Sequence, residues 1–147
     1  MIRTANMRAH AMLLMVALAA IAAPPAQAED RIRAGLWETT TTQGGKQINT
    51  GTRCITPELA ASSNENQAAT REMLQSSWAK ANCTLKELAV TASTISYSVD
   101  CATGADARTI SSVSKYHGDT FETELISKRS GSASDMITKG RRLGACP

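Results

Sequence analysis

Four cysteines are the residues whose type and spacing say most about the chemistry of this 147-residue chain. Cys54, Cys83, Cys101 and Cys146 follow one another at intervals of 29, 18 and 45 residues. A structural zinc site is normally nucleated by a close pair of cysteines, and no close pair is present. We therefore expect two disulfides, no bound metal and no free thiol.

Four cysteines can pair in three ways, and the sequence alone does not choose among them. We expect Cys54 to pair with Cys83, because that bond would pin both ends of a helical insertion to the sheet. Cys101 would then pair with Cys146 and tie the last strand to a central hairpin. The main alternative joins Cys83 to Cys101, because the hairpin places these two opposite each other, and leaves Cys54 for Cys146.

General acid-base chemistry most often uses a histidine held beside a nucleophile. His117 is one of two histidines and lies in a predicted turn, two residues before Asp119. The serines fall in predicted strands and turns and form no nucleophile-elbow pattern, and no glycine-rich phosphate loop is present. We therefore expect no enzyme activity, no catalytic residues and no cofactor.

The two tryptophans, Trp37 and Trp78, are the largest apolar side chains. We expect both to pack between helix and sheet, as most large aromatic side chains do. The functional alternative is a ligand contact, with Trp37 lining the mouth of a curved sheet on the face opposite Leu36.

The first 28 residues have the pattern of a signal peptide. Arg3 and Arg8 precede an uncharged run over residues 11–23, and a small-residue site ends at Ala28. The uncharged run is too short to span a bilayer, so we expect no stable membrane anchor. These features predict cleavage after Ala28 and a periplasmic or secreted protein.

The remaining residues, 29–147, are enough for one domain and too few for two. Cleavage removes two of the 16 basic residues and none of the 13 acidic ones, which leaves 14 minus 13, a net charge of +1. A near-neutral domain is a weak candidate for nucleic-acid binding, and we expect none. The basic clusters at 128–129 and 139–142 are expected to be solvated ends of strands.

Apolar residues alternate with polar ones through most of the mature chain, which predicts β-strands. Residues 83–101 are the clearest case, a hairpin with a turn at 91–94 and Ile95, Tyr97 and Val99 on one face. The alternation is equally clear at residues 121–125, whereas Ile110 and Val113 fall on opposite faces of their strand and predict a bulge there.

One helical insertion is predicted between the second and third strands. Thr56 followed by Pro57 is a helix start, and Leu74 and Trp78 stand at i and i+4 on one face of the second part. We expect an α+β fold that is mainly β. It would be a curved antiparallel sheet of about seven strands, either open or closed into a small barrel, with this helical insertion and disulfide staples.

Several short motifs resemble those of the domain of unknown function 3617 family of exported bacterial proteins. They are Gly35-Leu36-Trp37-Glu38, the run from Arg53 to Glu58, Cys83, Cys101, and the closing run from Arg142 to Cys146. The resemblance covers nearly the whole mature chain. It implies an exported, cysteine-linked protein, and the family has no established activity or site residues to carry over.

An exported domain of this kind without a catalytic constellation is expected to be a binding or interaction module. The first hypothesis is a small apolar or envelope-derived ligand held inside the curve of the sheet. The alternative is a protein partner, for example an envelope enzyme that the domain inhibits through the loops around His117 and Ser130. An enzyme of unrecognised type is the third possibility.

Overall fold

The computed structural model describes residues 30–102 and 107–147 of the chain. It contains seven strands and two helices. In chain order they are β1 (Gly35–Gln43), β2 (Lys46–Ile55), α1 (Pro57–Ser63), α2 (Gln67–Ala79), β3 (Cys83–Val90), β4 (Thr94–Cys101), β5 (Arg108–Tyr116), β6 (Thr120–Arg129) and β7 (Ser132–Gly144). The expected signal peptide, residues 1–28, lies outside the described residues.

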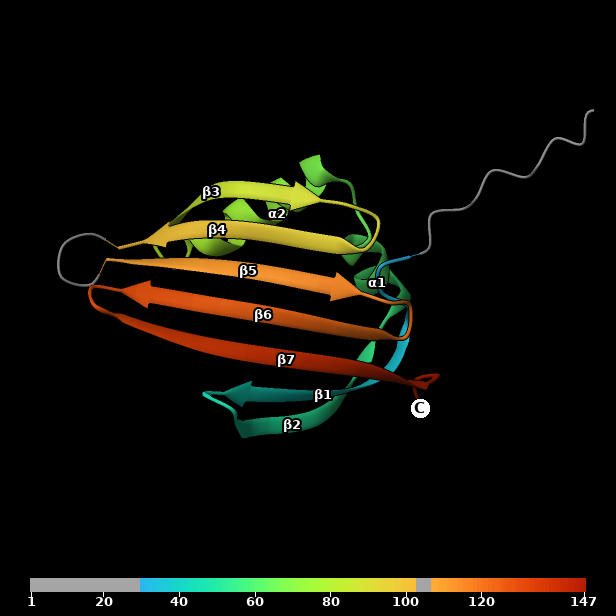
Figure 1. Ribbon diagram of the computed structural model, residues 1–147. Coiled ribbons are helices and arrows are strands. Elements are labelled where there is room, and N and C mark those ends of the chain that lie inside the picture. The colour runs from blue at the N-terminus through green and yellow to red at the C-terminus, as the bar shows by residue number, and fades with distance from the viewer. Residues whose placement is uncertain (1–29, 103–106) are drawn as a thin grey trace, which may run out of the picture.

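All seven strands form one antiparallel sheet in the order β2-β1-β7-β6-β5-β4-β3. Figure 1 shows this order from bottom to top, with β3 and β2 as the two edges. The predicted curved antiparallel sheet of seven strands is confirmed. The sheet is open, which decides between the two alternatives, an open sheet and a small barrel, that the sequence left. β3 packs against α2, and β2 lies at the opposite edge.

The turns and caps follow the local sequence. Gly44 and Gly45 connect β1 to β2 with φ angles of 54° and 77°, which glycine adopts without strain in a two-residue hairpin turn. The Thr56 hydroxyl accepts a hydrogen bond from the Leu59 N–H at 3.3 Å, and Pro57 is the first helical residue. The predicted start of the helical insertion is therefore confirmed.

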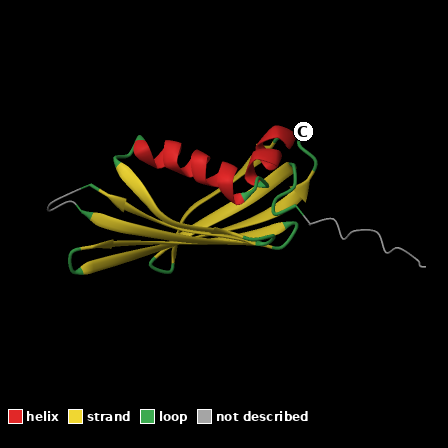
Figure 2. Cartoon of the chain, turned by 90° about the horizontal axis from the view of Figure 1, so that it is seen from above, coloured by secondary structure: helices red, strands yellow, loops and turns green. Residues whose placement is uncertain are grey.

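The insertion consists of two helices rather than one. α1 ends at Asn64, and Asn66 begins α2 by accepting hydrogen bonds from the N–H groups of Ala68 and Ala69 at 2.9 and 3.1 Å. The sequence from Ser62 to Gln67 has no apolar residue to bury, so the chain can turn there at little cost. Both helices lie on one face of the sheet, as Figure 2 shows.

Residues 30–34, which precede β1 and are called the N-terminal segment below, hold the helical insertion against one end of the sheet. Arg31 is buried and donates hydrogen bonds to the backbone carbonyls of Thr91 at 2.8 Å, Ser63 at 3.3 Å and Glu65. The Asn64 side chain bonds both the N–H and the carbonyl of Ile32, at 3.0 and 2.9 Å. These contacts connect β1, the α1–α2 junction and the β3–β4 turn.

The two disulfides are Cys54–Cys146 and Cys83–Cys101, and the described residues contain no free cysteine. The expected pairs, Cys54 with Cys83 and Cys101 with Cys146, are wrong, and the alternative is the one observed. Cys83 and Cys101 are direct partners in the β3–β4 ladder. Cys54 and Cys83 lie on the two edge strands, with five strands between them, so they cannot bond to each other.

The expected bulge in β5 is also absent. β5 pairs with β4 and β6 without any shift of register, and Val113 is simply an outward-facing residue that is 37% exposed. Bulges occur instead at residue 48 in β2, residue 86 in β3 and residue 143 in β7. Two of these three bulged strands are the sheet edges.

Candidate functional site

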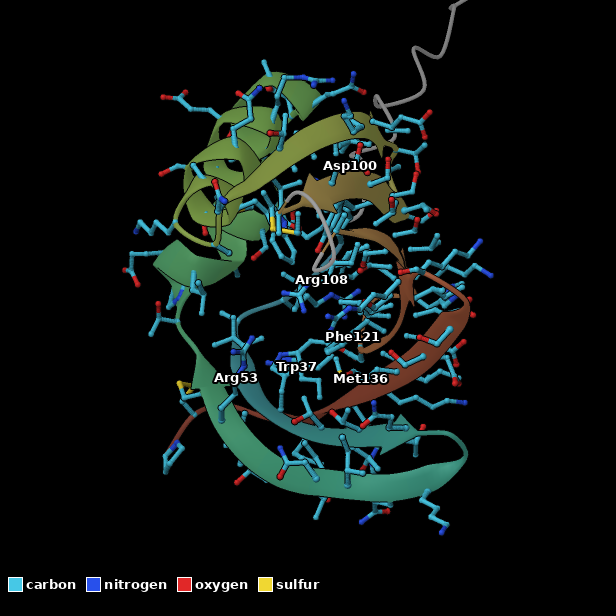
Figure 3. All side chains as sticks on the ribbon, turned by 90° about the vertical axis from the view of Figure 1, so that its left-hand side faces the viewer. Trp37, Arg53, Asp100, Arg108, Phe121 and Met136 are labelled. Atoms are coloured by element: carbon cyan, nitrogen blue, oxygen red, sulfur yellow. A yellow bond between two sulfur atoms is a disulfide. The ribbon has the colours of Figure 1, made fainter. Side chains whose placement is uncertain are left out.

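The curved sheet has a concave face, on which the helices lie, and a convex face. Figure 3 looks along the strands and shows Trp37, Phe121, Met136 and Arg108 inside the curve, with Arg53 at its open side. Because side chains alternate between the two faces of a strand, the ladder registers assign each remaining strand residue to one face or the other. The partners of Trp37 in β2 and β7 lie on the concave face. From them the assignment continues by alternation along each strand, with a shift of one residue at each bulge, and by ladder partners from strand to strand.

The acidic residues of the strands are confined to one face of the sheet, whereas cations occur on both faces. All six acidic residues of the strands lie on the convex face, and the concave face of the strands carries cations and no acid. The acids are Glu38, Glu87, Asp100, Glu122, Glu124 and Asp135, and the cations of the concave face are Lys46, Arg53, Arg108, Arg129 and Arg142.

Three of the convex-face cations have carboxylate partners. Arg141 contacts Glu38 at 2.9 Å, Lys139 contacts Glu122 at 3.0 Å, and Lys86 in the β3 bulge contacts Asp100 at 3.7 Å. These pairs are exposed, so each contributes little to stability. They do neutralise the convex face, and the cluster at 139–142 therefore does not form one basic stripe.

The concave-face cations Arg53 and Arg108 are different. Both are exposed, and within residues 30–102 and 107–147 neither side chain makes a hydrogen bond or an ion pair. Arg142 is held in place instead, because its Nε donates to the Ala34 carbonyl at 2.8 Å and its guanidinium lies 3.9 Å from Asp119. Arg53 and Arg108 are therefore the guanidinium groups available to a ligand.

Hydroxyl groups line the middle of the concave face. Thr41 of β1 and Thr138 of β7 share a hydrogen bond of 3.1 Å, and Ser114 of β5 and Thr123 of β6 share one of 2.8 Å. Ser112 is also on this face and is buried. A hydroxyl has one proton to donate and two lone pairs, so each pair keeps capacity for a polar ligand group.

Most of the apolar side chains of the concave face are packed into two clusters. One, at the end closed by the N-terminal segment, contains the fully buried Trp37 with Ile32, Ile55 and Ala60. The Trp37 indole N–H donates to the Arg33 carbonyl at 2.9 Å. The packing role expected for Trp37 is confirmed, and its full burial excludes a ligand contact in this conformation.

The second cluster lies under α2 and surrounds the Cys83–Cys101 bond, with Val99 and Ile110 buried beside it. Trp78 of α2 is half-buried and packs against Tyr97 with ring centroids 6.1 Å apart. Its packing role is confirmed as well. α2 packs on β3 through this cluster, as the positions of Leu74 and Trp78 predicted.

Tyr116 lies between the clusters, with its ring centroid 6.2 Å from that of Phe121. Burial raises the pKa of the Tyr116 phenol, and a hydrogen bond with Ser114 lowers it by less. At the surface, the Glu58 carboxyl in the first turn of α1 has a lowered pKa, because backbone and Thr56 hydrogen bonds stabilise its charged form.

His117 lies exposed in the turn between β5 and β6, where its backbone N–H donates to the Thr120 carbonyl at 2.9 Å. Among the described residues, no group of three or more His, Cys, Asp or Glu side chains is placed to hold a metal ion. The same part of the chain contains no helix that is long and apolar enough to cross a membrane.

The concave arginines were not singled out from the sequence. A usable signal was present, because Glu38 follows Trp37, and Glu122 and Glu124 flank inward-facing residues of β6. Each acid is thus out of phase with the apolar face of its strand.

Fold and site together define a small disulfide-linked, mainly β protein with an open curved sheet, one helical insertion and a concave strand surface that carries no acidic side chain. The chain belongs to the family described as protein of unknown function (DUF3617), whose sequence model matches residues 32–146. The resemblance noted from the short motifs is confirmed. No curated protein and no solved structure is significantly similar to the chain.

Proposed function

We propose that this protein is a binding module that holds an anionic ligand on the concave face of its sheet. The observation that carries the proposal is the division of charge, since the strand acids are all on the convex face, and Arg53 and Arg108 on the concave face have no partner among residues 30–102 and 107–147. A guanidinium presents several fixed N–H donors and binds carboxylate, phosphate and sulfate groups in a bidentate manner.

Local charge, rather than total charge, would attract the ligand. The chain after the predicted cleavage carries 14 basic and 13 acidic residues, so the protein as a whole has almost no net charge. A strand surface that holds cations and hydroxyls without acids favours a positive local potential, which attracts an anion to that side.

The composition of the face favours an anionic ligand over the apolar ligand expected from the sequence. Most of the large apolar side chains of the concave face, Trp37 and Val99 among them, are packed into the two clusters. The rest of the lining is mainly threonine, serine and arginine. We also propose binding rather than catalysis, since the hydroxyls that line this face bond one another and His117 stands in an exposed turn.

We further propose that the protein works outside the cytoplasm, in the periplasm or as a secreted protein. Two disulfides support this location, because such bonds persist in oxidising compartments. The signal-peptide pattern of residues 1–28 supports it independently.

Binding of dextran sulfate, compared with neutral dextran, tests the proposed function because the two polymers share a backbone and differ in charge. The immobilised protein should bind the sulfated polymer, and the affinity should fall as salt is added. Arg53→Gln and Arg108→Gln should each weaken binding by between about twofold and tenfold.

Lys115→Gln is the matched control. Lys115 is an exposed convex-face cation of β5, so its replacement removes the same charge from the other face and should leave binding unchanged. Equal losses for all three variants would mean that the concave face is not the binding surface. Equal binding of both polymers would refute the anionic ligand.

A further inference from the structure

The outer edge of β2 is open. Every residue from Lys46 to Cys54 is exposed, and β2 has a neighbouring strand on one side only. Figure 1 shows β2 as the lowest strand, with no element beyond it. Its outward backbone N–H and carbonyl groups can therefore pair with another extended chain.

The other edge, β3, is protected. α2 packs against β3, and the Gln67 side chain accepts a hydrogen bond from the Val90 N–H at 3.4 Å. Both edge strands contain a bulge, so the covering helix is what distinguishes β3 from β2. An added strand is therefore expected at β2 and not at β3.

The charges of β2 restrict what can be added. Residues 47–52 are uncharged and contain no proline, and the two charged residues of the strand, Lys46 and Arg53, are both basic. Lys46 pairs with Gln43 of β1, and Arg53 pairs with Trp37, so both cations face the concave side. A strand added to β2 would meet one cation near each end of its uncharged middle.

The β2 bulge sets the spacing of the groups that would oppose these cations. Lys46 and Arg53 are seven residues apart in β2, yet their partners in β1 are six apart, because residue 48 is the extra residue of the bulge. In a regular strand, side chains on one face are an even number of residues apart. A regular strand added on the outer side should therefore place residues six apart opposite Lys46 and Arg53.

We propose that β2 pairs with an extended segment of another polypeptide that carries two acidic residues six positions apart on one face. This inference rests on the proposed function, because it names the anionic ligand as an acidic peptide segment. A second copy of this chain fits the edge less well, since two paired β2 strands would bring together four cations and no acid.

The test uses synthetic peptides of alternating Thr and Val, one with two glutamates six positions apart and one with the same two glutamates seven apart. Both peptides carry the same charge, but in the second peptide the glutamates point to opposite faces. Fluorescence anisotropy of the labelled peptides gives their Kd for the full chain. Amide hydrogen exchange reports whether β2 becomes protected.

The six-spaced peptide should bind more tightly and slow amide exchange within β2. Arg53→Gln and Lys46→Gln should each raise its Kd by between about 1.5-fold and fivefold, the range for one cross-strand charge pair. Lys115→Gln should not change it. A peptide with lysines in place of the glutamates should bind only the variant with Lys46→Glu and Arg53→Glu.

Equal Kd values for the two spacings, or protection elsewhere than β2, would overturn the strand-pairing inference. If dextran sulfate binds through Arg53 and Arg108 and neither peptide binds, the proposed function stands and the inference falls. If neither the polymer nor the peptides bind, the proposed function and the strand-pairing inference are both refuted. Self-association through β2 that excludes the peptides would also overturn the inference and would appear as a concentration-dependent mass.

Discussion

Gly140→Ala should destabilise the protein, because the ring of Phe121 occupies the space that a side chain at residue 140 would need. Gly140 of β7 and Phe121 of β6 are direct partners on the concave face. A Cβ added at Gly140 would lie closest to Cε1 of Phe121 and 2.5 Å from both Cδ1 and Cζ. Carbon atoms that are not bonded approach to about 3.5 Å, so the ring would have to move by more than about 1 Å.

The ring has little freedom to make that movement. Its centroid lies 5.6 Å from that of Trp37 and 6.2 Å from that of Tyr116, and Trp37 is fully buried. Overpacking of this kind costs about 1–3 kcal/mol, and a tightly enclosed ring favours the upper half of that range. Replacing glycine by alanine in a strand returns roughly 0.5–1 kcal/mol, which leaves a net loss of about 1–2.5 kcal/mol.

Urea unfolding followed by tryptophan fluorescence measures this loss. Gly51→Ala is the matched control. Gly51 of β2 lies on the concave face, as Gly140 does, and a Cβ added there meets no atom within 4 Å. Its effect should be neutral or stabilising. Combining Gly140→Ala with Phe121→Leu should cost less than the sum of the two single changes. Additive losses, or equal effects at the two glycines, would refute the packing argument.

Two further predictions concern stability. Joint replacement of Cys54 and Cys146 by serine opens a loop with a sequence separation of 92 residues and should cost about 4–5 kcal/mol by loop-closure entropy, measured by urea unfolding. Peptide mapping without reductant should recover Cys54 joined to Cys146, and any other partner contradicts the pairing. Burial raises the pKa of Tyr116, so its contribution to stability is present below its unfolded pKa of about 10 and is lost as pH rises through the folded pKa. Tyr116→Phe should therefore reduce the fall in unfolding free energy above about pH 10, and an unchanged slope would contradict this.

Much of the fold could be predicted from local patterns. The alternation in β4 and β6 and the Thr56-Pro57 helix start depend on residues close in sequence, and the structure confirms them. The break between α1 and α2 was visible only as a run without apolar residues. Its geometry depends on Asn64, which is also bonded to Ile32 of the N-terminal segment.

The disulfide pairing could not be predicted because it depends on the order of strands in the sheet. Cys54 and Cys83 flank the insertion in sequence, but β7 pairs with β1, and this places five strands between β2 and β3. The assignment of charged residues to the concave or the convex face could not be predicted for the same reason. Alternation shows that Glu122 and Phe121 point in opposite directions, whereas only the assembled sheet shows which direction is concave.

The two disulfides are nested, with the Cys83–Cys101 loop lying inside the Cys54–Cys146 loop. A protease that cuts the backbone once anywhere between residues 54 and 146 therefore releases no fragment, because the outer bond still joins the two pieces. The exposed connection between α1 and α2 lies within this interval. A nick there would leave a single covalent molecule of unchanged mass, apart from one added water, and the two chains would separate only after reduction.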